Sequence, residues 1–192
     1  GRVVHGVVQP ELVERVAQVV VGVDVLAAVG AAVAAHQVAQ PVDQATGPAA
    51  VNHVLDFAPD GTVWYTGQRA GVLGRFNPKT GGVERIPLGK GSAPHGVIVG
   101  PDGAAWVTDS GQNAIVRVDP ISKEVKAWPL PASRSGANLN TAAFDGRGRI
   151  WFTGQTGIYG RLDPATGKME VWDAPKGVGP YGITATPSGD IY

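Results

Sequence analysis

The chain has 192 residues, with 16 Lys plus Arg against 16 Asp plus Glu, so its formal net charge is zero. A neutral chain has no general electrostatic footprint for a polyanion, which disfavours nucleic acid and acidic membrane surfaces as partners. It contains no Cys, so disulfides and Cys-ligated metals are excluded. The length is sufficient for one domain with a sizeable core.

The first 48 residues differ in composition from the rest. They contain 15 Val and nine Ala but no Lys, Ser, Asn, Phe, Tyr or Trp. Their apolar positions are nearly continuous, and Gly22, Asp24 and Gly30 interrupt the run, which disfavours a free-standing amphipathic helix. We expect residues 1–48 to form a leader that is helical or disordered.

Two further explanations of this leader stay open. Except for Thr46, each of its residues can be encoded by a codon that begins with G or C, as a GC-rich gene read in a shifted frame would give. The segment would then be a mis-framed or artefactual start. An export signal is the other alternative, which Asp24 disfavours; the same charge would cost roughly 3 kcal/mol in a membrane span.

From residue 49 the sequence repeats with a period close to one propeller blade. Trp64, Trp106, Trp151 and Tyr192 occupy matching places, at spacings of 42, 45 and 41 residues. We call these four residues the markers. A Gly, Pro or Asp turn precedes each marker, and the short strands alternate apolar with polar residues, as in antiparallel four-stranded sheets. The pattern predicts an all-β fold for residues 49–192.

This fold is an incomplete β-propeller of about three and a third four-stranded blades. The blades are predicted over about 50–92, 93–137 and 138–178, with the start of a fourth over 179–192. Each sheet buries its faces only against its neighbours, so stability normally requires the ring to close. Because the sequence stops in mid-blade, we expect that it is truncated and that the remainder holds more blades.

Four polar or aromatic residues share one place in the repeat, eleven residues before each marker. These axial residues are His53, His95, Asn140 and Tyr181. Equivalent positions of all blades fall on one ring near the propeller axis, so the four side chains are expected to converge. Neutral His is a base near pH 7, and Asn and Tyr suit a carbonyl-rich ligand. The alternative is a ring that binds only ordered water.

Two other residue types recur at fixed places in the blades. Asp109 follows its marker by three residues and is a candidate metal ligand, with a hydrogen-bonded loop carboxylate as the alternative. Arg75, Arg117 and Arg161 recur on the third strand of each blade. For these arginines we expect inter-blade salt bridges rather than contacts with a substrate.

Several strings of the repeat resemble the virginiamycin B lyase (streptogramin B lyase) family over residues 50–192. They are Pro94-His95-Gly96-Val97, Trp106-Val107-Thr108-Asp109, Ile150-Trp151-Phe152-Thr153 and Pro180-Tyr181-Gly182-Ile183-Thr184. The resemblance implies a seven-bladed propeller of which about half is present here. It also implies a metal-assisted elimination that opens the ester of a cyclic depsipeptide, a type B streptogramin antibiotic, and hence antibiotic resistance.

The resemblance assigns roles to the axial residues. His95 would be the general base that removes the proton alpha to the ester carbonyl. His53, in the same register 42 residues earlier, would contact the substrate together with Asn140 and Tyr181. Mg²⁺ would polarise the carbonyl, because imidazole alone is too weak a base for an ester alpha proton.

The family's two metal-binding carboxylates correspond to Ala93 and Asp109, so Asp109 is the metal ligand expected here. Mg²⁺ keeps several waters and can use one carboxylate. Two other functions stay open: a non-catalytic ligand-binding or sensor propeller, and a gluconolactonase-like lactone hydrolase, which would need more carboxylates. We expect a small-molecule or cyclic-peptide ligand and a monomer when complete, without nucleic-acid or membrane partners. The compartment is left open, with the cytoplasm preferred to the periplasm.

Overall fold

The computed structural model describes residues 52–192, and the leader predicted over residues 1–48 lies outside the described residues. Three four-stranded antiparallel sheets follow one another along the chain, each with its strands in sequential order. These sheets confirm the predicted all-β fold, an incomplete β-propeller. No helix within residues 52–192 is long and apolar enough to cross a membrane.

Each sheet is built from short strands joined by tight turns. The first sheet contains β1 (Asn52–Phe57), β2 (Val63–Gly67), β3 (Val72–Asn77) and β4 (Gly82–Pro87). The second contains β5 (Pro94–Val99), β6 (Ala105–Asp109), β7 (Ala114–Val118) and β8 (Val125–Pro129). A short 3-10 helix (Ala132–Arg134) leads to the third sheet, which contains β9 (Leu139–Phe144), β10 (Ile150–Gly154), β11 (Ile158–Leu162) and β12 (Met169–Asp173).

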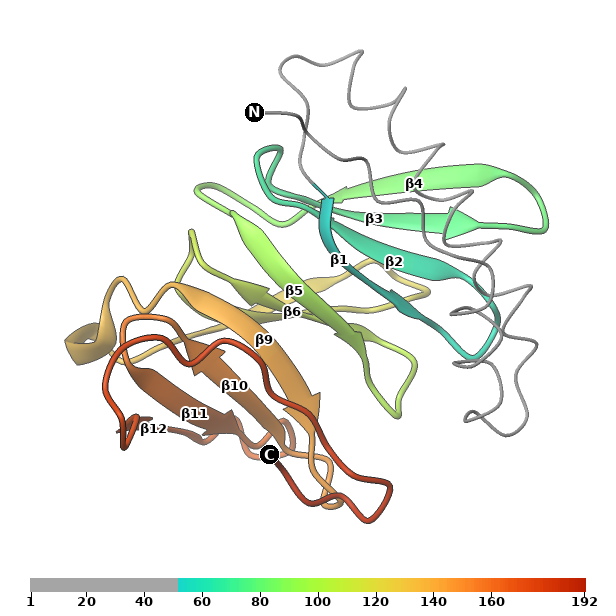
Figure 1. Ribbon diagram of the computed structural model, residues 1–192. Coiled ribbons are helices and arrows are strands. Elements are labelled where there is room, and N and C mark those ends of the chain that lie inside the picture. Colours follow the sequence, from blue (N-terminus) through green and yellow to red (C-terminus); the bar gives the residue numbers. More distant parts are fainter. Residues whose placement is uncertain (1–51) are drawn as a thin grey trace, which may run out of the picture.

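The first strands of the three sheets lie side by side. In Figure 1, β1, β5 and β9 run in the same direction, with their starts on one side of the molecule. β5 contacts β1 and β2 of the preceding sheet, and it also contacts β9 of the next sheet. This is the arrangement of innermost strands in a propeller, in which equivalent positions share one ring.

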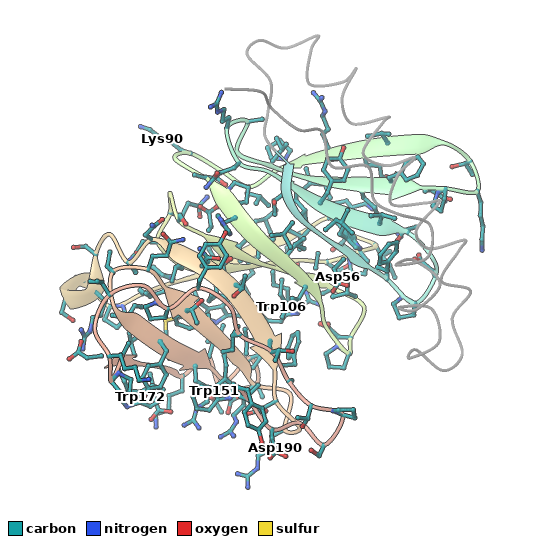
Figure 2. The ribbon with its side chains drawn as sticks, viewed as in Figure 1. Asp56, Lys90, Trp106, Trp151, Trp172 and Asp190 are labelled. Atoms are coloured by element: carbon teal, nitrogen blue, oxygen red, sulfur yellow. The ribbon has the colours of Figure 1, made fainter. Side chains whose placement is uncertain are left out.

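The hydrophobic core lies between the sheets, as the alternation of apolar residues predicts. One cluster joins the first two sheets through Trp64, Leu73 and Val107. A second joins the next pair through Trp106 and Phe152, among others, and Figure 2 shows Trp106 between these sheets. Since each cluster draws on two blades, no blade buries its own faces alone.

The segment that follows β12 begins a fourth unit with the register of the other three. Thr184 and Tyr192 exchange two backbone hydrogen bonds of 2.9 Å, and Thr186 donates its N–H to the carbonyl of Asp190. Each marker thus pairs with the residue eight positions before it, as Trp106 pairs with Ile98 in the second sheet. The repeat therefore sets the same pairing in all four units.

The three recurring arginines form their salt bridges inside their own blades, so the expectation of inter-blade salt bridges is wrong. Each is the Cα partner of its marker Trp on the neighbouring strand, and its guanidinium lies 5.1 to 5.9 Å from that indole ring. Arg75 pairs with Asp60 at 2.9 Å, and Arg117 with Asp102 at 2.8 Å, and each Asp lies in the turn before the second strand of the same blade. Arg75 reaches the next blade only through a hydrogen bond of 3.1 Å to the carbonyl of Pro120. The indole attracts the cation across the strand pair, which the one-dimensional repeat does not reveal.

Third-strand glycines give room to aromatic rings. A Cβ placed on Gly160 would overlap the ring of Phe152, its Cα partner on β10. Phe152 is fully buried, so its ring cannot swing into solvent. The small residue on β11 is therefore required by the ring on β10.

We expect Gly160→Ala to lower the free energy of unfolding by about 1–3 kcal/mol, because the methyl group overpacks the buried ring. Chemical unfolding of the full-length protein measures the change. Gly82→Ala is the control, since Gly82 is exposed on β4 and its Cβ would meet only the flexible Thr80 hydroxyl, at 3.2 Å. Equal stability of the two variants would contradict this packing.

The tight turn after each third strand is closed by a side-chain oxygen. Asp119 accepts hydrogen bonds of 2.9 Å from the backbone N–H groups of Ile121 and Ser122. These bonds, with that from Ser122 the larger effect, lower the pKa of the Asp119 carboxyl to about 2. Asn77 fills the same place in the first sheet and accepts from Lys79, so a neutral amide is compatible with this turn.

Asp119→Asn should therefore lose a stabilising contribution that depends on pH. A carboxyl with a lowered folded pKa stabilises fully above its unfolded value of 3.8, and the contribution disappears as the pH falls through about 2. The difference in Tm between wild type and variant should be constant near neutral pH and shrink between about pH 4 and pH 2. A difference that persists unchanged to the lowest pH would contradict the turn assignment.

Candidate functional site

The axial residue of the second blade lies at a β-bulge. Pro94 pairs with Asp109 and Gly96 pairs with Thr108, so His95 is the inserted residue between two ladder positions. β1 and β9 show the same irregularity at the same place in their pairing. A bulge bends the strand and re-aims the inserted side chain, so β5 and β9 turn their axial residues by one device, and the backbone of β1 has the same irregularity.

A buried threonine on the second strand links each bulge to the next blade. Thr66 donates its hydroxyl proton to the carbonyl of His95 at 2.8 Å, and Thr153 donates to the carbonyl of Tyr181 at 2.7 Å. Thr108 makes the corresponding bond to the carbonyl of Asn140. We call these three residues the bridging threonines. They fix the backbones of His95, Asn140 and Tyr181, each to the blade before it.

The bridging threonines also accept from their own blades. The N–H of Gly96, next to His95, donates to Thr108 at 2.9 Å. The N–H groups at the matching places in β1 and β9 point to their threonines at 3.4 Å. Each hydroxyl therefore contacts two adjacent bulges at once, and it does so fully or nearly fully buried from water.

The structure brings His95 and Tyr181 together, as the shared repeat position predicts. Their ring centroids lie 6.2 Å apart at an interplanar angle of 84°, an edge-to-face contact. His95 is 9 % exposed, whereas Tyr181 is 58 % exposed. The imidazole is thus nearly buried, with the more exposed tyrosine ring against it.

Asn140, the axial residue of the third blade, is completely buried. Both its amide nitrogen and its amide oxygen are shielded from solvent, and neither has a hydrogen-bond partner in the described part of the chain. A buried amide without hydrogen bonds costs free energy, but an amide that is 0 % exposed presents no surface to a ligand in this structure. The predicted role of Asn140 in substrate binding stays a prediction.

The side chain of His53 lies outside the described part of the structure. Its backbone belongs to β1, at the irregular pairing between Asn52 and Leu55. The convergence of two imidazoles on one centre therefore stays a prediction for His53, while its register position is the expected one.

Asp109 uses both carboxylate oxygens to organise the loops around His95. Oδ1 accepts the N–H groups of Ala93 at 2.9 Å and of Gly111 and Gln112 at 3.0 Å. Oδ2 accepts the hydroxyl of Ser92, and the residue is 0 % exposed. This is the geometry of the hydrogen-bonded loop carboxylate that the sequence left open as the alternative to metal binding.

The described residues do not fit a Mg²⁺ ion by themselves. Residues 52–192 contain no group of three or more His, Asp or Glu side chains that could hold a metal. Asp109 would have to exchange hydrogen bonds for a cation, and Ala93 supplies only a methyl group. The assignment of Asp109 as metal ligand stays a prediction from the resemblance.

The bridging threonines and Ser92 are site residues that the sequence analysis did not identify. A signal for the threonines was present, since all three stand two residues after a marker. Threonine is also a common strand residue, so the repeat alone did not separate a role in hydrogen bonding from β propensity. Ser92 recurs in no other blade and gave no signal.

One groove of the described chain is lined by none of His95, Asn140 and Tyr181. It has a volume of about 950 Å³ and runs along the third sheet and the segment after it, lined by Trp151, Tyr159 and Asp190, among others. Figure 2 shows Trp151 and Asp190 at this edge of the molecule. The matching face of the second sheet is covered by Phe144, which packs on Trp106. This groove is therefore a blade-packing surface.

Comparison with protein-family models gives one match, to the virginiamycin B lyase family, over residues 27–192. This chain belongs to that family. The match begins inside the segment 1–48 that the composition sets apart. Comparison with curated proteins gives no match.

Solved structures of the family have the same fold. Virginiamycin B lyase from Staphylococcus aureus is 28 % identical with a TM-score of 0.68, and the alignment covers 76 % of this chain and 49 % of that one. A catalytically inactive His-to-Ala variant of the same enzyme, with quinupristin, gives 28 %, 0.69, 76 % and 49 %. A streptogramin B lyase gives 25 %, 0.68, 76 % and 48 %. The chain spans about half the length of these structures.

We expect Asp109→Asn to destabilise the protein by about 1–3 kcal/mol, because the amide replaces an acceptor oxygen by a donor facing the Ser92 hydroxyl or the backbone N–H groups. Chemical unfolding of the full-length protein measures the loss. Asp173→Asn is the matched control, since Asp173 is exposed and pairs only with Arg134 among the described residues. A stability loss confined to Asp173→Asn would contradict the loop role of Asp109.

Proposed function

We propose that this protein catalyses an elimination that opens the ester ring of a cyclic depsipeptide of the type B streptogramin class. Family membership supports this proposal, and so does the place of His95 at the bulge. The inactive His-to-Ala variant among the solved relatives also supports a histidine as an essential group. The proposal concerns the whole protein, of which this chain is about half by the length of the relatives.

The atoms of such an elimination determine which proton has to be removed. The ester bond between the alkyl carbon and oxygen breaks, and the oxygen leaves with its electron pair as a carboxylate. A carbon–carbon double bond forms only if a C–H bond breaks on the carbon adjacent to that alkyl carbon. The proton that the resemblance places on the carbon alpha to the ester carbonyl is therefore reassigned to this adjacent carbon, and His95 takes it.

The environment of His95 suits a general base. The imidazole is nearly buried, which limits competition from water for the proton. Imidazole in general is the side-chain group best suited to act as a base near neutral pH. Tyr181 contacts the imidazole edge to face, and its exposed ring offers an apolar surface to a bound peptide ring. The substrate-contact roles of His53 and Asn140 rest on the resemblance alone.

The described residues do not fit a metal, so none of these steps runs through one. The predicted Mg²⁺ stays a prediction. If Mg²⁺ is bound in the whole protein, it would stabilise the negative charge that develops next to the broken C–H bond.

The decisive experiment is incubation of the full-length protein with a type B streptogramin, with Mg²⁺ and separately with EDTA. An elimination leaves the product mass equal to that of the intact antibiotic, whereas hydrolysis adds one water. We expect an unchanged mass together with a new double-bond absorbance. A mass increase of one water would support the lactone hydrolase instead, and absence of turnover with Mg²⁺ would exclude the lyase.

His95→Asn should lower kcat by about 10²–10⁴, the usual contribution of a positioned general base. His53→Asn is the matched variant, because a substrate contact of the same side-chain type should mainly raise KM. Steady-state kinetics on both variants, with folding checked by circular dichroism, separates the two roles. Full activity of His95→Asn would remove the base assignment.

One observation favours a second candidate, a non-catalytic ligand-binding propeller. The buried carboxylate of Asp109 already accepts four hydrogen bonds from its own loops, so it is not free to hold the cation that catalysis would need. Binding of the intact antibiotic without turnover, measured by calorimetry, would support this candidate.

A further inference from the structure

Two polar side chains hold the backbone around His95, one through the residues before it and one through its own carbonyl. On the N-terminal side, Asp109 binds the N–H of Ala93 and the hydroxyl of Ser92. At His95 itself, the hydroxyl of Thr66 reaches across from the first blade to the carbonyl. The two groups come from different blades, so the position of the imidazole depends on how the blades are joined.

The bulge makes this second hold necessary. Because His95 is inserted between the ladder pairs of Pro94 and Gly96, the regular pairing with β6 does not set its backbone torsions alone. The carbonyl of His95 belongs to this inserted peptide. A hydrogen bond to that carbonyl therefore selects one orientation of the bulge, and with it one direction of the side chain.

We propose that Thr66 is a positioning residue for the base His95. Thr66 is 0 % exposed, so it does not touch a ligand; it acts through the 2.8 Å bond from its hydroxyl to the His95 carbonyl. The same arrangement at Thr108 and Thr153 shows that this bond is a repeated device, and among the three bridging threonines only Thr66 acts on a histidine. The proposal rests on the proposed function for its effect on turnover, and on geometry alone for its effect on His95.

Thr66→Val removes the hydroxyl and keeps the branched shape, whereas Thr66→Ser keeps the hydroxyl. In the full-length protein we expect Thr66→Val to lower kcat by about ten- to a hundred-fold, as small displacements of a catalytic group do, with KM within about two-fold of wild type. Thr66→Ser should restore kcat to within about three-fold of wild type. Thr62→Val is the matched control, because it removes a buried hydroxyl of the same sheet that bonds to Asp60 and not to His95.

A second measurement does not depend on turnover. The imidazole signal of His95, assigned in NMR spectra by its loss in His95→Asn, should shift in Thr66→Val and keep its position in Thr66→Ser and Thr62→Val. If Thr66→Val does not fold, Thr66→Ala removes the same hydroxyl without a second methyl group and takes its place.

The outcomes separate this proposal from the proposed function. Unchanged His95 signals in Thr66→Val would overturn the positioning role, whatever the activity. A wild-type protein without lyase turnover would overturn the proposed function, while a shifted His95 signal would still support the positioning role. An equal loss of kcat in Thr66→Val and Thr62→Val would reduce Thr66 to a general stability effect and overturn the proposal.

Discussion

The hydrogen bond from a buried threonine hydroxyl to the carbonyl of the next blade is the interaction on which the candidate site depends. Apolar packing between sheets is non-directional and tolerates small rotations of one blade against another. A hydroxyl that accepts from its own bulge and donates to the next one has a direction and a length. It therefore fixes the register between blades to within the tolerance of a hydrogen bond, which the cores alone do not.

This constraint acts where function is expected. The innermost strands converge, so an error in the angle between blades is transmitted directly to the side chains near the axis. Bulges at those positions would add freedom if nothing held their carbonyls. Because Thr66 and Thr153 hold the carbonyls of His95 and Tyr181, the two rings meet edge to face although 86 residues separate them in the sequence.

Much of the fold could be predicted because the repeat carries it. The markers and the turns before them fix strand order and pairing, and even Tyr192 pairs in the predicted place. Side-chain partners could not be predicted in the same way. Arg75 has a recurring position, but the repeat does not say whether its cation meets a carboxylate of the next blade or the indole beside it. Because Arg75 and Trp64 are opposite each other on paired strands, the guanidinium of Arg75 lies over the indole ring of Trp64.

The candidate site was predictable as a set of positions and less so as chemistry. His95 and Tyr181 share a repeat position, and the ring geometry brings them together. Asp109 also has a recurring position, but its bonds to Ser92 and three backbone N–H groups depend on how two loops fold over each other. No pattern in the sequence distinguishes a carboxylate that binds its own loop from one that is free to bind a cation. In the sequence, an aspartate that binds Mg²⁺ and an aspartate that binds its own loop look the same.

The distinction between a lyase and a binding module therefore depends on charge near His95. A neutral imidazole removes a carbon-bound proton only if the developing anion is stabilised. The arginines that recur on the third strands do not supply this charge, because Arg75, Arg117 and Arg161 are each engaged by an indole ring and a carboxylate of their own blade. The axial residues of these blades thus provide a candidate base, His95, with the ring of Tyr181 against it. Under the proposed function, a stabilising cation or donor from outside the described residues has to face His95, and its presence would decide whether a bound depsipeptide is opened or only held.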